Sequence, residues 1–201
     1  PALVDAVIWR VVPEEGAILA SMQTGAGDIS YVMPEWAIAQ LSSMPNLTVA
    51  EPRVSNYSAY LGLRPFREMT SERAVRQAMN MAVDREALAE SMWFGQATPA
   101  TTLVSPKTID HSSEVQATYD PDAARDLLEE AGWELASDGF RYKDGKRLSP
   151  SILAAGTSGW RSRLEAIQGF MNEVGIDLQL QLVEPAAAMS QINTSPDFDG
   201  Y

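Results

Sequence analysis

The sequence predicts an α/β fold with a mixed or parallel sheet flanked by helices. Segments with strand character alternate with segments with helix character along most of the 201 residues, which favours this class over an all-β sandwich. Residues 70–95 carry complete start and stop signals for a pair of helices. With 45% hydrophobic residues, the chain can bury one sizeable core, alone or with a smaller appended unit.

In the first 50 residues, we expect strands to alternate with helices. The expected strands are residues 7–12, 29–32 and 47–50, and the expected helices are residues 13–22 and 34–41. Pro13 and Pro34 favour helix starts, because proline fits the first helical turn. Gly25 and Gly27 are expected to stop the first helix.

The helix pair follows a stretch at residues 57–63 that is expected to be extended. Thr70 or Ser71 is expected to cap the first helix of the pair, and Asp84 the second, which ends near Gly95. Apolar side chains of the first helix recur at helical spacing and predict a buried stripe, formed by Ala74, Val75, Ala78, Met79 and Ala82.

The remainder of the chain begins with a segment rich in Pro, Thr and Ser. This segment, residues 97–113, predicts a long surface loop, the kind of segment that often carries function. After it we expect a helix at residues 120–131, a small hairpin with a tight Asp-Gly turn around residues 140–143, strands at residues 151–155 and 176–183, and helices at residues 160–174 and 185–192.

Charge and composition disfavour several classes of partner and site. The 27 acidic and 15 basic residues give a net charge of −12, which disfavours nucleic acid and anionic membrane surfaces as partners. The absence of cysteine excludes disulfides and thiolate metal sites within this sequence. No apolar run reaches the roughly 18 residues of a membrane span. The first residues read as a strand entered partway, and not as a signal peptide, so we expect a fragment of a longer protein.

The sequence carries no pattern that predicts catalysis. Its single histidine, His111, lies in the Ser/Thr-rich loop, and the sequence contains no G-x-S-x-G nucleophile motif. It also contains no cluster of metal-ligating residues at characteristic spacing, and the glycines within residues 25–27 do not form a dinucleotide-binding fingerprint. We therefore expect no enzyme activity, no cofactor and no metal site.

A binding site is predicted instead at residues 156–161, between an expected strand and an expected helix. Free N–H groups at the helix start, the hydroxyls of Thr157 and Ser158, and the guanidinium of Arg161 can receive a carboxylate. In open α/β sheets, ligands bind outside the carboxyl ends of the strands, where this loop is expected. A capped helix with Arg161 in solvent and Trp160 in the core fits the same residues.

Two ordered blocks of the sequence resemble the family 5 extracellular solute-binding proteins, the dipeptide- and oligopeptide-binding receptors of ABC importers. The first block contains Pro65-Phe66, Val75-Arg76-Gln77-Ala78, Ala82-Val83-Asp84-Arg85 and Gly95, and the second contains Tyr119-Asp120-Pro121, Ala123-Ala124, Leu127-Leu128 and Ala131-Gly132-Trp133. Weaker similarity at Gly25, Asp28, Ile29, Met33-Pro34 and Gly175-Ile176-Asp177 extends the likeness over nearly the whole chain. Arg64 departs from the family pattern, which has asparagine there.

The resemblance implies the fold of a type II periplasmic-binding protein with two lobes. Residues 1–53 are then the returning part of the first lobe, residues 54–63 a crossing between the lobes, and residues 64–201 the second, C-terminal ligand-binding lobe. The implied function is that of the substrate-binding component of an ABC transporter, which captures a peptide or similar small solute between the lobes and delivers it to a membrane permease. The implied location is periplasmic or extracellular, with attachment to the membrane through the importer or through a lipid anchor outside this fragment.

The resemblance also implies a set of ligand-binding residues. Family members use the loop at residues 156–161 for charged ligand ends, the crossing lines the hinge, and residues near Met33 face the cleft from the first lobe. The residues expected to bind ligand are Thr157, Ser158, Trp160, Arg161, Tyr57, Tyr60, Met33 and Glu184. Two alternatives stay open, namely a free-standing α/β interaction or adaptor domain without small-molecule binding, and a hydrolase on the same fold.

Overall fold

The chain divides into two compact units, residues 1–53 and residues 54–201. The computed structural model describes residues 3–50, 58–106, 108–109, 111–112, 114 and 117–201. Within these residues, both sheets and most of the helices belong to the second unit.

The first unit consists of short helices and irregular segments. Helix α1 spans Glu15–Thr24, the short 3-10 helix η1 spans Glu35–Ala37, and α2 spans Ile38–Ser42. Helix α1 ends as expected at Gly25, whose φ of 72° lies in the left-handed region that glycine adopts without strain. The segment expected as one helix at residues 34–41 is divided between η1 and α2.

The strands expected in the first unit are not formed. Residues 7–12, 29–32 and 47–50 have irregular backbone, and none of them pairs with another strand among the described residues. Many of their large side chains are exposed, including Ile8 at 81% and Val11 at 94%. β-Branched residues favour extended backbone, but a strand also needs a neighbour that completes its hydrogen bonds, and the described part of this unit offers none.

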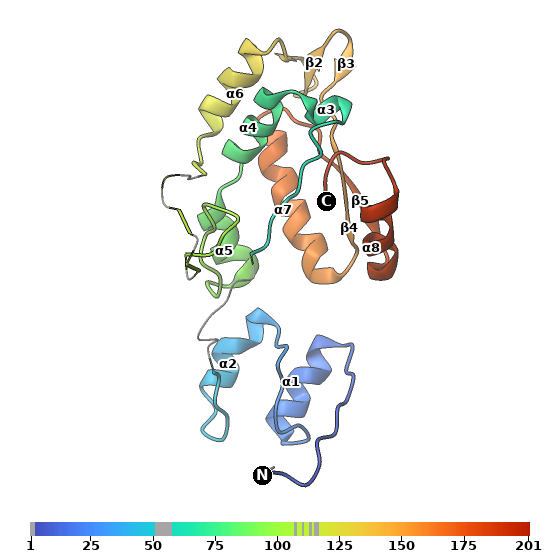
Figure 1. The fold of residues 1–201 in the computed structure, drawn as a ribbon. Helices are drawn as coiled ribbons and strands as arrows, with labels where there is room; N and C mark the ends of the chain where they lie inside the picture. The colour runs from blue at the N-terminus through green and yellow to red at the C-terminus, as the bar shows by residue number, and fades with distance from the viewer. Residues whose placement is uncertain (1–2, 51–57, 107, 110, 113, 115–116) are drawn as a thin grey trace. The chain divides into compact units, whose positions relative to one another are not determined.

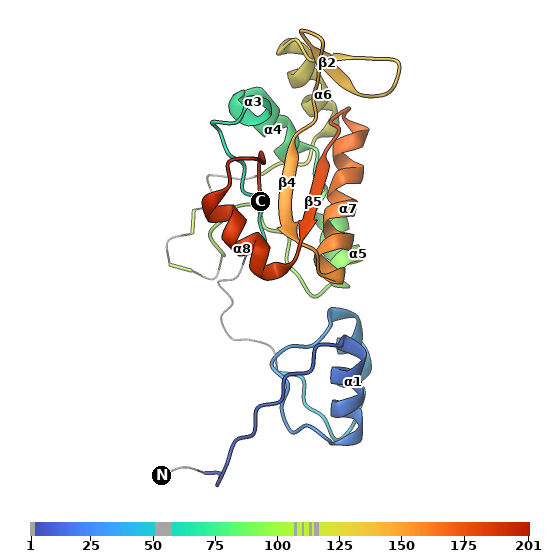
Figure 2. The ribbon, with the colours of Figure 1, turned by 90° about the vertical axis from the view of Figure 1, so that its right-hand side faces the viewer.

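The second unit is built on two parallel strands, β4 (Ser151–Ala155) and β5 (Gln179–Val183). Helix α7 (Ser158–Glu173) connects the two strands, and helix α8 (Pro185–Thr194) follows β5. The two helices lie on opposite faces of the strand pair (Figures 1 and 2). This arrangement confirms the α/β class predicted from the sequence.

The sheet that contains β4 and β5 includes both parallel and antiparallel pairing. The parallel ladder begins at Ser151, which lies opposite Gln179, and continues in register to the ends of both strands. Gly200 adds two isolated bridges, one parallel to Ile152 and one antiparallel to Leu63. Segments from both ends of the second unit therefore extend the sheet beyond β4.

Four further helices lie in the described part of the second unit. They are α3 (Glu68–Ser71), α4 (Arg73–Met81), α5 (Arg85–Trp93) and α6 (Pro121–Glu130), and α4 packs against α6. The expected cap of α5 is confirmed, because the Ala87 N–H donates to Asp84 Oδ1 at 2.9 Å. Gly95 follows the end of α5 with a φ of 72°, close to the expected helix end.

The cap expected at Thr70 or Ser71 is wrong. Glu72 occupies the N-cap position of α4 and makes no side-chain capping bond. The two hydroxyl residues already belong to the helical turn α3, so their side chains turn back toward preceding carbonyls. Thr70 Oγ1 donates to the carbonyl of Arg64 at 2.6 Å, and Ser71 Oγ donates to the carbonyl of Glu68 at 3.0 Å.

A small antiparallel sheet lies beyond the amino end of β4, with strands β1 (Glu134–Leu135), β2 (Arg141–Lys143) and β3 (Lys146–Arg147). The expected Asp-Gly turn joins β2 to β3, and both Asp144 (φ 53°) and Gly145 (φ 73°) have the positive φ that a tight hairpin turn requires. Strand β1 is an addition that the sequence pattern did not predict.

The core of the second unit lies between the parallel strands and helices α4, α6 and α7. Its buried members are Val75, Ala78, Met79, Ala82, Ala124, Leu128, Trp133, Leu148, Ile152, Leu164, Met171, Val174, Ile176 and Leu178. The apolar stripe predicted for α4 contributes all of its members to this core except Ala74, which is only half-buried. The described part of the expected loop at residues 97–113 contains neither helix nor strand.

Candidate functional site

The carboxyl ends of β4 and β5 lie side by side, and each strand leads directly into a helix. Ala155 pairs with Val183 at the end of the ladder, and the Gly156 N–H donates to the carbonyl of Val183 at 2.7 Å. Helix α7 begins after Thr157, and α8 begins after Glu184. Both helix N-termini therefore open at one edge of the sheet, which we call the carboxyl edge (residues 156–161 and 184–185).

Neither helix at the carboxyl edge is capped by the side chain of its N-cap residue. Thr157 and Glu184 are both exposed, and neither side chain makes a capping hydrogen bond. The N–H groups of a first helical turn have no acceptor within the helix, and they carry the positive end of the helix dipole. The two helix starts can therefore bind a carboxylate or a carbonyl oxygen.

Arg161 adds a positive charge at this edge. Its side chain is 53% exposed, and Nη1 lies 4.0 Å from Glu165 Oε1 in the next turn of α7. An ion pair this exposed contributes at most about 1 kcal/mol, so a ligand carboxylate can compete with Glu165 for the guanidinium.

An aromatic cluster borders the carboxyl edge. Trp160 is half-buried, and Arg163 Cζ lies 5.4 Å from the centroid of its ring. The same guanidinium lies 4.3 Å from the ring of Trp93, the last residue of α5. The cluster thus joins α5 to α7 through a cation–π arrangement and holds Trp160, which lies in the first turn of α7.

Arg163 and Trp93 were not among the residues expected at the site. Trp160 and Arg163 are three positions apart on one helix, so the i, i+3 spacing is a signal that could have identified the arginine. No local pattern connects Trp93 with α7, because the contact depends on how α5 packs in the fold.

The structure brings Thr157, Trp160, Arg161 and Glu184 to the carboxyl edge. Ser158 is the first residue of α7. Of the other expected residues, Tyr60 is 61% exposed on the segment that precedes the helices of the second unit. Met33 is half-buried in the first unit, and Tyr57 lies outside the described residues.

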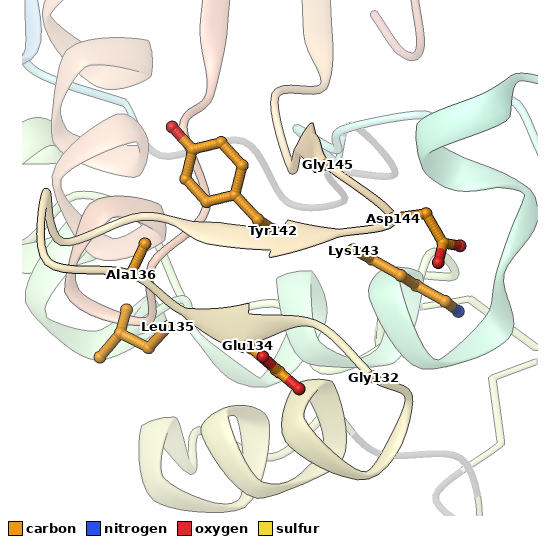
Figure 3. A pocket seen from close by; sticks show the side chains of 8 residues that line it. All are labelled: Gly132, Glu134, Leu135, Ala136, Tyr142, Lys143, Asp144 and Gly145. Carbon is orange, nitrogen blue, oxygen red and sulfur yellow. The ribbon is translucent and has the colours of Figure 1, made fainter.

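A depression of about 460 Å³ lies on the small antiparallel sheet (Figure 3). Figure 3 shows Tyr142 and Lys143 pointing to opposite sides of β2. Lys143 Nζ is paired with Glu72 at 3.0 Å, and Tyr142 Oη donates to Asp138 Oδ2 at 2.9 Å. Both of these polar groups therefore already bind partners within the protein.

Two further features of the described residues concern metal ligands and membrane-spanning helices. In that part of the chain, no group of three or more His, Cys, Asp and Glu side chains is placed to hold a metal ion. Among its helices, none has the length and apolar character needed to cross a membrane. His111, the single histidine, places Nδ1 3.0 Å from the carbonyl of Val104.

The chain resembles known proteins. Residues 1–201 match the family described as bacterial extracellular solute-binding proteins, family 5 middle. The oligopeptide-binding protein AppA of Bacillus subtilis is 28% identical over 201 residues, which cover 97% of this chain and 36% of AppA. The solved structure of AppA with a nonapeptide has 28% identity and a TM-score of 0.78, covering 94% of this chain and 38% of that one.

Two further relatives are named for different ligands. The glutathione-binding protein GsiB of Salmonella typhimurium is 34% identical over 137 residues, which cover 68% of this chain and 26% of GsiB. The nickel-binding periplasmic protein of Escherichia coli is 30% identical over 183 residues, which cover 87% of this chain and 34% of that protein.

The chain thus spans about a third or less of the length of these curated relatives. Its likeness to the AppA structure shows the fold of a type II periplasmic-binding protein, as the sequence resemblance implied. The match over residues 1–201 decides the family. The chain belongs to family 5 of the bacterial extracellular solute-binding proteins.

Proposed function

We propose that this chain is part of the substrate-binding component of an ABC transporter, which captures a peptide or a similar small solute and delivers it to a membrane permease. The observation that carries the proposal is the carboxyl edge, where two uncapped helix starts lie next to Arg161 and Trp160. Residues 1–53 then belong to the first lobe, residues 54–63 cross between the lobes, and residues 64–201 form the second lobe. The protein acts outside the cytoplasmic membrane.

In this proposal, the negative end of the ligand binds at the first turns of α7 and α8, with Arg161 as counter-charge. Trp160, held by Arg163, supplies an apolar surface beside that end. Closure of the two lobes buries the ligand, and the binding free energy stabilises the closed state. No covalent bond is made or broken, so the protein is not an enzyme.

A peptide is the favoured ligand class, because AppA and GsiB are named for an oligopeptide and for the tripeptide glutathione. The test is thermal unfolding of the full-length protein with a panel of di- to pentapeptides, glutathione, sugars and nickel chelates. A ligand at about 100 times its Kd stabilises the folded state by about 2.7 kcal/mol and raises Tm.

The variant Arg161→Ala should reduce the Tm rise given by a stabilising ligand. Arg73→Ala is the matched control, since Arg73 is an exposed arginine at the start of α4, outside the carboxyl edge. Stabilisation by one solute class, weakened only by the first variant, supports the proposal. No stabilisation by any member of the panel would favour an interaction domain that binds no small molecule.

A further inference from the structure

Two segments that are distant in the sequence meet next to Arg64. The Gly62 N–H donates to the carbonyl of Tyr201 at 2.7 Å, and the Tyr201 N–H donates to the carbonyl of Gly62 at 2.9 Å. The Arg64 N–H donates to the carbonyl of Asp199 at 2.7 Å. Residues 62–64 and 199–201 therefore form a short antiparallel pairing, which we call the short ladder.

The side chain of Arg64 fastens this ladder to the end of α8. Nη1 donates to the carbonyl of Ser195 at 2.7 Å, and Nη2 donates to the carbonyl of Ile192 at 2.6 Å. The last carbonyls of a helix have no donor within the helix and carry the negative end of its dipole, so a guanidinium is well suited to them. The guanidinium also lies 3.7 Å from the centroid of Phe198, whose side chain is buried.

Helix α8 connects the contacts of Arg64 with the carboxyl edge. Its first residue, Pro185, belongs to that edge, and its last turn is held by Arg64. A helix of this length, 10 residues, extends over about 15 Å and behaves as a stiff element. The position of the carboxyl edge relative to the short ladder therefore depends on how firmly Arg64 holds the other end of α8.

We propose that Arg64 is a positioning residue for ligand capture. It fixes α8, and with it Glu184 and Pro185 at the carboxyl edge, to the short ladder formed by residues 62–64 and 199–201. This inference rests on the proposed function, because it assumes that the carboxyl edge binds ligand. Arg64 itself touches no ligand in this assignment, and acts through α8 and through the backbone of residues 62–64.

The first test is hydrogen exchange in the full-length protein with Arg64→Met and Arg64→Lys. Loss of the two charged hydrogen bonds should speed exchange of the Gly62 and Tyr201 amides by about tenfold or more, while amides of α4 keep their rates. Arg64→Lys keeps the charge but lacks the planar fork, so we expect an intermediate increase. This milder variant keeps the test decisive if Arg64→Met does not fold.

Arg141→Met is the matched control. Arg141 is buried, whereas Arg64 is half-buried. The guanidinium of Arg141 also donates to two carbonyls, those of Val174 at 2.9 Å and Trp133 at 2.6 Å, and it pairs with Glu129 at 2.6 Å; none of these partners belongs to α8. We expect this variant to speed exchange near the small antiparallel sheet and to leave the Gly62 and Tyr201 amides unchanged. Uniform acceleration throughout the second unit in Arg64→Met would show a purely stabilising role and overturn the inference.

A second measurement asks whether Arg64 acts beyond the second unit. Spin labels can be placed at Gln40→Cys and Glu130→Cys, two exposed positions in the two units, after any cysteine outside this cysteine-free sequence is replaced by serine. Without ligand, Arg64→Met should broaden the distribution of label separations, whereas Arg141→Met should not. An unchanged distribution of label separations overturns the inference, even if a ligand of the thermal unfolding panel raises Tm. A broadened distribution without a rise in Tm from any ligand of that panel contradicts the proposed function alone.

Discussion

The substitution Gly200→Ala tests the sheet arrangement most directly, because Gly200 has no room for a side chain. A Cβ atom at this position would lie 2.7 Å from the carbonyl oxygen of Gly62 and 2.8 Å from Ile152 Cδ1. Nonbonded atoms do not approach this closely, so the backbone must shift. Overpacking of this kind typically costs about 1–3 kcal/mol.

The assay is urea unfolding of the full chain, followed by far-UV circular dichroism. Gly169→Ala is the matched control, since Gly169 lies within α7 and a Cβ there would meet no atom within 4 Å. Alanine in a helix interior should stabilise the fold by about 0.5–1 kcal/mol relative to glycine. The two variants should therefore shift the free energy of unfolding in opposite directions. A Gly200→Ala protein as stable as the parent would refute the close packing of residue 200 between the two segments.

Two further predictions concern the core and the pH dependence of stability. Leu128→Ala should lower the free energy of unfolding by about 2–5 kcal/mol, because Leu128 is fully buried. Leu127 is only half-buried, so Leu127→Ala should lower this free energy less. Equal losses in urea unfolding would contradict the burial of Leu128 in the core. The Phe140 N–H and then the Tyr142 hydroxyl hold the pKa of Asp138 below its usual range. A carboxyl whose pKa is lower in the folded state stabilises the fold above its unfolded pKa of about 3.9, and this contribution disappears as the pH falls through the folded pKa. Asp138→Asn should therefore be less stable than the parent at neutral pH and approach it in acid, whereas a difference that is constant with pH would exclude this role.

Features set by neighbouring residues could be predicted from the sequence. The cap at Asp84 depends on an N–H three residues later, and the turn at Asp144 and Gly145 depends on two adjacent positive φ values. The strands expected in the first unit depend instead on partners that local patterns do not reveal. Ile8 and Val11 have strong strand propensity, but their segment pairs with no other strand among the described residues.

The candidate site shows the same division. Thr157 and Glu184 could be placed because each follows a strand and precedes a helix, and parallel strands end at a common edge. The contact of Trp93 with Arg163 requires the packing of α5 on α7. The hydrogen bonds from Arg64 to the end of α8 likewise join residues that only the complete fold brings together.

Under the proposed function, the parallel direction of β4 and β5 has a consequence for how a ligand arrives. Because α7 and α8 both start at the same edge, the fields of their dipoles add there and do not cancel. A zwitterion that approaches this edge experiences a torque as well as an attraction, since its two ends respond in opposite ways. We expect an extended ligand to enter with its negative end leading. The parallel direction of the two strands sets the direction of this electric field, and the field orients the ligand before any side chain contacts it.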